Sequence, residues 1–134
     1  MITSESQVTV RYAETDMMGF VYHGNYFAWF EIGRTDLFKS LGISYKELEK
    51  QDYRLPVLEV SAKYLRPAFY DDTLTIKTTV CDKPVLRFNL KYEIKRGDEL
   101  ITTGTSTHAF IDATGHPVRP PSWAVERLIK AFEA

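Results

Sequence analysis

The segment from Asn25 to Leu41 predicts a helix that the rest of the chain must surround. Its apolar side chains occupy more than one stripe of a 3.6-residue helical wheel, which is typical of a helix buried on several sides. Gly33 costs a helix interior about 1 kcal/mol relative to alanine, and close approach of another backbone is the expected compensation. Asn25 is expected to be the N-cap and Gly42 to follow the last turn. The apolar side chains are Tyr26, Phe27, Trp29, Phe30, Ile32, Leu37, Phe38 and Leu41.

Alternating apolar and polar side chains predict five strands around this helix. Ser44 and Glu47 predict a capping box for a short helix ending near Lys50, and Pro120-Pro121-Ser122 starts a C-terminal helix. One strand, a buried helix and four strands joined mostly by tight turns favour an α+β fold, with an antiparallel sheet packed on the helix. A length of 134 residues suits a single domain spanning 1–134. The predicted strands are 7–12, 53–65, 73–80, 85–95 and 99–111.

Composition excludes several classes of function. A net charge of −1 argues against a nucleic-acid partner, because phosphate binding needs a basic excess on one face. No run approaches the about 18 apolar residues that span a bilayer, and the first residues lack the pattern of a signal peptide. The single cysteine, Cys81, suits a reducing compartment. A cytoplasmic protein without a membrane span is therefore expected.

A short polar motif stands directly before the buried helix. Asp16 lies in a Thr-Asp-Met-Met-Gly loop, where an aspartate is commonly a turn residue, but a carboxylate can also act as a nucleophile or a general base. The free amides near Tyr22, His23 and Gly24 carry the positive end of the helix dipole and could stabilise an oxyanion. A turn role and a close backbone approach are equally compatible with Gly19 and Gly24.

These residues carry a resemblance to a known family. The motif from Asp16 to Tyr26, followed by an aromatic helix, resembles the active-site segment of hotdog-fold acyl-CoA thioesterases of the 4-hydroxybenzoyl-CoA thioesterase type. A second stretch resembles the family's segment between two strands. The resemblance implies the hotdog fold, in which a five-stranded antiparallel sheet curls around a long central helix, and assembly into homodimers or homotetramers by edge-to-edge pairing. The two stretches are Asp16-x-x-Gly19-x-Val21-Tyr22-His23-x-Asn25-Tyr26 and Tyr64-Leu-Arg-Pro67-Ala68-x-Tyr70-Asp71-Asp72-x-Leu74-x-Ile76.

The same resemblance implies roles for the motif residues. Asp16 either attacks the thioester, forming an acyl-aspartyl anhydride, or activates water, and the amide of His23 polarises the thioester carbonyl. The His23 side chain either orients water or substrate, or only caps and packs the helix. An N-cap role is the plainer interpretation of Asn25. The substrate-binding candidates around the catalytic pair are Gly19, Tyr22, Gly24 and Asn25.

Coenzyme A adds phosphates, which lysine or arginine should bind at the mouth of the cleft. Lys83 and Arg87, near the turn before the fourth strand, are the favoured candidates, although surface charges of this kind are more often simply solvated. His108 and His116 lie eight residues apart without zinc-type spacing, so neither a metal nor a redox cofactor is expected.

The sequence thus predicts hydrolysis of an acyl-CoA, or acyl carrier protein, thioester to a free acid and a thiol. Two alternatives stay open at this point. A hotdog dehydratase or hydratase is one, although its usual His-Phe-Pro signature is missing. A non-catalytic acyl-CoA-binding module is the other, and such a module does not need Asp16. The acyl group, aryl or aliphatic, is not determined by the sequence.

Overall fold

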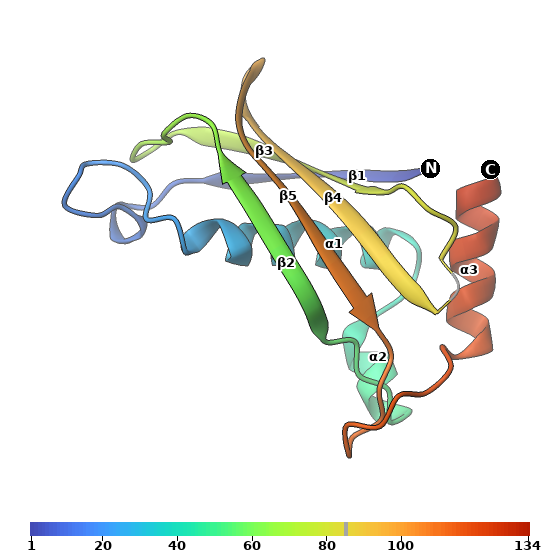
Figure 1. Cartoon of the computed structure of the whole chain (residues 1–134). Coiled ribbons are helices and arrows are strands. Elements are labelled where there is room, and N and C mark those ends of the chain that lie inside the picture. The colour runs from blue at the N-terminus through green and yellow to red at the C-terminus, as the bar shows by residue number, and fades with distance from the viewer. Residues whose placement is uncertain (85) are drawn as a thin grey trace.

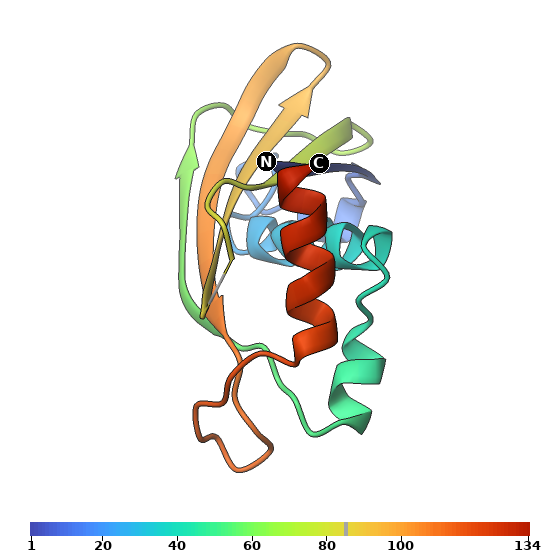
Figure 2. The ribbon, with the colours of Figure 1, turned by 90° about the vertical axis from the view of Figure 1, so that its right-hand side faces the viewer.

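The structure, a computed structural model, describes residues 1–84 and 86–134. Five strands form one antiparallel sheet in the order β1-β3-β4-β5-β2, and the sheet curves around α1 (Figure 1). Helix α3 stands at the opposite end of α1 from the loop that joins β1 to α1 (Figures 1 and 2). The elements are β1 (Ile2–Thr9), a 3-10 turn (Tyr12–Glu14), α1 (Asn25–Ser40), α2 (Tyr45–Lys50), β2 (Val57–Tyr64), β3 (Thr73–Val80), β4 (Arg87–Arg96), β5 (Glu99–Ala109) and α3 (Ser122–Glu133).

Helix α1 is buried because the sheet makes room for its rings. Phe30 is fully buried and stacks on Tyr92 of β4, with ring centroids 4.4 Å apart. Gly104 of β5 lies under the same ring, where an added Cβ would come 2.4 Å from Phe30. A Cβ on Gly33 would come 2.3 Å from Thr78 Oγ1, so the helical glycine accommodates side chains of β3 rather than the backbone expected from the sequence. The predicted central helix is confirmed, and side-chain packing explains its glycine.

Several predicted boundaries and contacts are wrong. The first strand is Ile2–Thr9 rather than 7–12, because the polar residues before Gln7 also pair with β3 in register. Tyr12 lies in the 3-10 turn. Ser44 occupies the N-cap of α2 but forms no capping hydrogen bond from its side chain, so the predicted capping box is absent there. The predicted start of the fourth strand at position 85 lies outside the described residues, and β4 is described from Arg87.

Strand β2 leaves apolar side chains uncovered at the edge of the sheet. It pairs with β5 on one side only, and Val57, Val60 and Tyr64 stay 43–45% exposed. A bulge between Val57 and Glu59 interrupts the alternation. Leu58, which lies within the bulge, lines a separate hollow with Leu86. Strand β2 is one of the two edge strands of the sheet, β1 being the other, and an edge strand can pair with a further strand.

A chain of buried polar groups crosses the inner face of β4 and β5. Tyr92 Oη lies 2.6 Å from Ser106 Oγ, which lies 2.8 Å from His108 Nε2, and His108 Nδ1 lies 3.2 Å from the Pro56 carbonyl. Because a carbonyl only accepts, His108 donates from Nδ1. In the neutral imidazole Nε2 then accepts from Ser106, and Tyr92 donates to Ser106. Burial, assisted by the charge of Arg34, lowers the pKa of His108 to about 4.

The low pKa of His108 predicts a loss of stability in acid. The unfolded state binds a proton near pH 6.5 and the folded state only near pH 4, so the stabilisation is complete above pH 6.5 and falls as the pH drops to 4. The loss from this one group is about 3 kcal/mol of unfolding free energy. Urea denaturation between pH 7 and pH 4 measures it against a His108→Gln variant, in which the slope should be shallower. Equal slopes in the two proteins contradict the assignment.

Candidate active site

Asp16 is fixed in a tight loop between β1 and α1. Thr15 and Val21 form an antiparallel bridge across the loop, and the Asp16 amide donates to the Phe20 carbonyl at 3.0 Å. Gly19 closes the turn with a φ of +87°, a conformation that suits glycine. The amide of Met18 donates to Asp16 Oδ1 at 2.9 Å. Within the described part of the chain no group donates to Oδ2, so this oxygen is available for chemistry.

The half-buried Asp16 carboxylate lines a pocket of about 440 Å³. The walls come from the Asp16 loop, the entrance of α1 and the segment that follows β2. They are largely aromatic and aliphatic, as a site that buries an apolar group requires. The other lining residues are Met18, Phe20, Val21, His23, Tyr26, Tyr64, Leu65, Arg66 and Pro67.

The first turn of α1 offers unpaired amides beside this pocket. The amide of Tyr22 donates to the Glu14 carbonyl at 2.9 Å, and the amide of Asn25 donates to the Tyr22 carbonyl at 3.0 Å. For the amides of His23 and Gly24, residues 1–84 and 86–134 supply no acceptor. Helix N-terminal amides of this kind bind anions and oxyanions. His23 lines the pocket that holds the Asp16 carboxylate, and Gly24 is the next residue along the chain.

Asn25 has a different role from the expected N-cap. The N-cap position is occupied by Gly24, with no side-chain capping bond, and Asn25 is the first residue of α1. Its Nδ2 donates to the Glu14 carbonyl at 2.8 Å, which ties the helix to the loop. The ring of the half-exposed Tyr22 covers Gly24, where a Cβ would come 2.7 Å from Tyr22 Cε2. Gly24 therefore permits a close side-chain approach, whereas Gly19 is a turn glycine.

Tyr64 connects the edge strand to the helix entrance. Its hydroxyl donates to the His23 carbonyl at 3.0 Å, and its ring packs edge-on against the His23 ring. Burial raises the pKa of Tyr64, so the hydroxyl stays a donor at neutral pH. Sequence reasoning found Tyr64 only as a marker of the fold, because its partner lies 41 residues away.

Comparison with known proteins assigns the family. Residues 10–128 match the family described as the Thioesterase-like superfamily. The chain belongs to this superfamily. A Bacillus subtilis relative, YneP, which carries a provisional acyl-CoA thioesterase name, is 39% identical over 113 residues, covering 84% of this chain and 82% of YneP.

Solved structures share the whole hotdog fold. A DHNA-CoA thioesterase from Staphylococcus aureus superposes with a TM-score of 0.90 at 38% identity, covering 99% of this chain and 94% of that one. A variant of 4-hydroxybenzoyl-CoA thioesterase in complex with 4-hydroxybenzoyl-CoA superposes with a TM-score of 0.86 at 19% identity, over 96% and 99% of the two chains, and shows the fold alone. The protein is therefore a hotdog thioesterase, and the expected fold and family are confirmed.

The two basic residues expected to bind phosphate lie outside the Asp16 pocket of this hotdog thioesterase chain. Lys83 Nζ pairs with Glu133 Oε1 of α3 at 3.1 Å. Arg87, at the start of β4, lines the separate hollow of about 550 Å³ that also contains Leu58. Arg66 is the basic residue that lines the Asp16 pocket.

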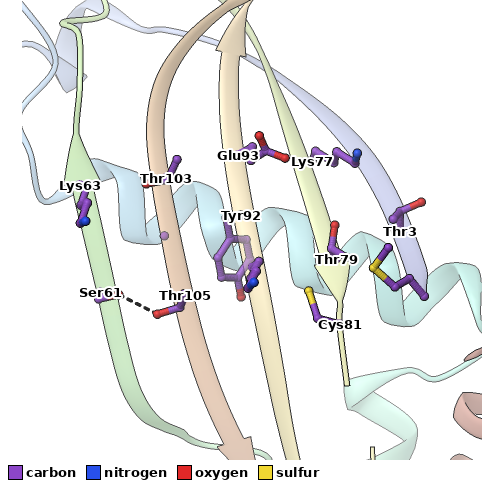
Figure 3. Close-up of a pocket in the computed structure, with 13 residues that line it drawn as sticks. Thr3, Ser61, Lys63, Lys77, Thr79, Cys81, Tyr92, Glu93, Thr103 and Thr105 are labelled. Carbon is purple, nitrogen blue, oxygen red and sulfur yellow. Dashed lines mark hydrogen bonds between the residues drawn. The ribbon is translucent and has the colours of Figure 1, made fainter. Parts of the chain in front are cut away.

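Another hollow lies on the face of the sheet turned away from α1 (Figure 3). It has a volume of about 530 Å³ and is lined mainly by threonine, serine and lysine side chains, with Ser61 and Thr105 hydrogen-bonded at 2.6 Å. Among the residues that line this hollow there is one carboxylate, Glu93, and none of them belongs to the start of a helix, so the hollow lacks the arrangement found around Asp16.

Among the described residues, no group of three or more His, Cys, Asp or Glu side chains is placed to hold a metal ion. None of the described helices is long and apolar enough to cross a membrane.

Proposed function

We propose that this thioesterase hydrolyses acyl-CoA thioesters, or the corresponding acyl carrier protein thioesters, at Asp16. Homology assigns the acyl-CoA thioesterase reaction itself. The placement of the chemistry is supported by one observation above all: Asp16 and His23 line the same largely apolar pocket, and the amides of His23 and Gly24 have no acceptor among the described residues. A thioester whose carbonyl oxygen accepts from these amides lies with its carbonyl carbon towards Asp16.

Two routes lead from this arrangement to a free acid and a thiol. In the first, Asp16 attacks the carbonyl carbon, the thiolate leaves, and water cleaves the resulting anhydride. In the second, Asp16 takes a proton from water, the hydroxide adds to the carbonyl carbon, and the thiolate leaves with a proton. Both routes consume one water. Recovery of ¹⁸O in the Asp16 side chain after a single turnover in labelled water supports the anhydride route.

The neighbouring residues position the substrate in this proposal. The His23 ring packs against Tyr22 and Tyr64 in the pocket wall, where it can orient water or the acyl group. Gly19 shapes the loop, and Asn25 holds the helix entrance in place through the Glu14 carbonyl. These contacts support a structural role for Gly19 and Asn25. Of the motif residues, Asp16 and His23 line the pocket, whereas Gly19, Tyr22, Gly24 and Asn25 are not among its lining residues.

The acyl group in this proposal is apolar, because the pocket walls are. Phe20, Tyr26 and Tyr64 supply ring surfaces that suit an aryl group, and the Staphylococcus aureus neighbour is named for an aryl substrate, DHNA-CoA. A panel of aryl and aliphatic acyl-CoA substrates distinguishes the two classes.

Arg66, which lines the Asp16 pocket and whose Nη1 lies 3.4 Å from Glu99 Oε2, is the candidate for binding a phosphate of coenzyme A at this pocket. Lys83 and Arg87 remain candidates for a partner subunit's ligand. A cytoplasmic location stays a prediction, consistent with the free Cys81.

The chain is proposed to act as a homodimer that pairs through β2. Val57, Val60 and Tyr64 expose apolar surface beside a strand edge that is unpaired in this chain, and a second copy covers both by antiparallel pairing. The dimer brings Tyr64, which lines the Asp16 pocket, into the interface. Further assembly into a tetramer is compatible with this pairing.

A charge on the β2 edge is expected to separate the dimer. Val60→Glu places two like charges on the pairing strands and should shift the protein from two chains to one in sedimentation equilibrium. Ile32→Glu, at a similarly exposed position of α1, is the control and should leave the dimer intact. A dimer that persists in Val60→Glu contradicts pairing through β2.

Asp16→Asn is expected to lower kcat/KM by at least about a thousandfold, because the amide can neither attack nor accept a proton. The fold should be unaffected, since Asn Oδ1 can still accept from the Met18 amide. Thiol release and thermal melting measure the two effects. Asp112→Asn is the matched control: its Oδ1 accepts from the amide two residues on at 2.9 Å, as in Asp16, but outside the pocket. Unchanged turnover in Asp16→Asn contradicts the proposed function.

A further inference from the structure

Glu14 is the point at which the Asp16 loop is attached to α1. Its backbone carbonyl accepts from the Tyr22 amide at 2.9 Å and from Asn25 Nδ2 at 2.8 Å. Its carboxylate accepts from the Arg11 amide through Oε1 at 2.8 Å and from Trp29 Nε1 through Oε2 at 3.2 Å. One residue therefore contacts the start of the loop, the end of the loop and the second turn of the helix.

The carboxylate of Glu14 is largely removed from solvent. Its side chain is 12% exposed, whereas the side chain of Arg11, whose Nε lies 3.5 Å from Oε1, is 77% exposed. Two N–H groups face its two oxygens, so the site requires an acceptor at both positions. A carboxylate supplies two acceptors, but a carboxamide supplies one acceptor and one donor group. Glutamine therefore has the right shape for this site and the wrong hydrogen-bonding pattern.

We infer that Glu14 is a positioning residue that holds Asp16 opposite the unpaired amides of α1. Asp16 lies two residues after Glu14 in the sequence. His23 and Gly24 lie in the sequence between Tyr22 and Asn25, the two residues that donate to the Glu14 carbonyl. Loss of the Trp29 contact leaves, within the described part of the chain, only the two hydrogen bonds to the Glu14 carbonyl between Glu14 and the helix entrance, so the loop can shift relative to the helix. A shift of about 1 Å between catalytic groups is enough to reduce turnover by orders of magnitude. This inference rests on the proposed role of Asp16.

The test is Glu14→Gln, measured on benzoyl-CoA and octanoyl-CoA as one aryl and one aliphatic substrate. The expected result, on whichever substrate the unaltered protein hydrolyses, is a kcat lowered at least tenfold with KM changed less than threefold, because the pocket walls stay while the reacting groups separate. Glu126→Gln, which removes the same charge from an exposed position of α3, is the control and should keep the original kcat.

The two tryptophans provide a spectroscopic readout of the contact itself. In a ¹H–¹⁵N spectrum, the indole N–H signal of Trp29 should move in Glu14→Gln. The signal of Trp123, whose indole donates to Gln51 Oε1 at 2.8 Å, should stay in place and report an intact fold.

Trp29→Phe removes the indole donor and leaves the Glu14 carboxylate, so this variant should also have a lower kcat. The double variant should be no slower than the worse single variant, because both break the same contact.

The inference is overturned if Glu14→Gln shifts the Trp29 signal but keeps kcat within threefold of the original value. Glu14 is then a structural residue. Additive losses in the double variant also overturn it, because they show that Glu14 acts by another path. The proposed function fails separately: in that case Asp16→Asn retains turnover, whatever Glu14→Gln does.

Discussion

The burial of one aromatic helix in a curved sheet is the constraint on which the rest of this structure depends. Phe30 can stack on Tyr92 only because Gly104 leaves space beneath its ring, and α1 can approach β3 only because Gly33 lacks a side chain. With one side of the helix buried against the sheet, its N-terminus lies at the end next to the loop that leaves β1. The loop from β1 must return to that same point, and it carries Asp16 there.

The candidate site uses the polarity of the helix. The amides of His23 and Gly24 at the positive end of the helix dipole have no acceptor among the described residues, and His23 lines the same pocket as the Asp16 carboxylate. The hydrogen bonds that fix this arrangement come from three separate segments. Glu14 holds the loop to the helix, and Tyr64 holds the edge strand to the His23 carbonyl. A dimer formed through β2 would thus be mechanically connected to the site.

Local patterns predicted the helix, the sheet and the Asp16 motif, because periodicity and turn chemistry are visible in neighbouring residues. What the sequence could not provide were partners distant along the chain. Lys83 pairs with Glu133, which no spacing rule indicates, and β1 starts before its apolar alternation because its polar residues pair with β3. Asn25 satisfies the usual preference for an N-cap, yet its side-chain Nδ2 donates to the carbonyl of Glu14, eleven residues earlier. The importance of Glu14 emerges only from such contacts.

A crystal structure with a non-hydrolysable acyl-CoA analogue, in which a methylene separates the sulfur from the ketone, would locate the reacting carbonyl directly. We expect the ketone oxygen to lie about 3 Å from the amides of His23 and Gly24, with its carbon facing the Asp16 carboxylate. A ketone bound away from the entrance of α1, in the outer hollow of the sheet or beside Arg87, would contradict catalysis at Asp16.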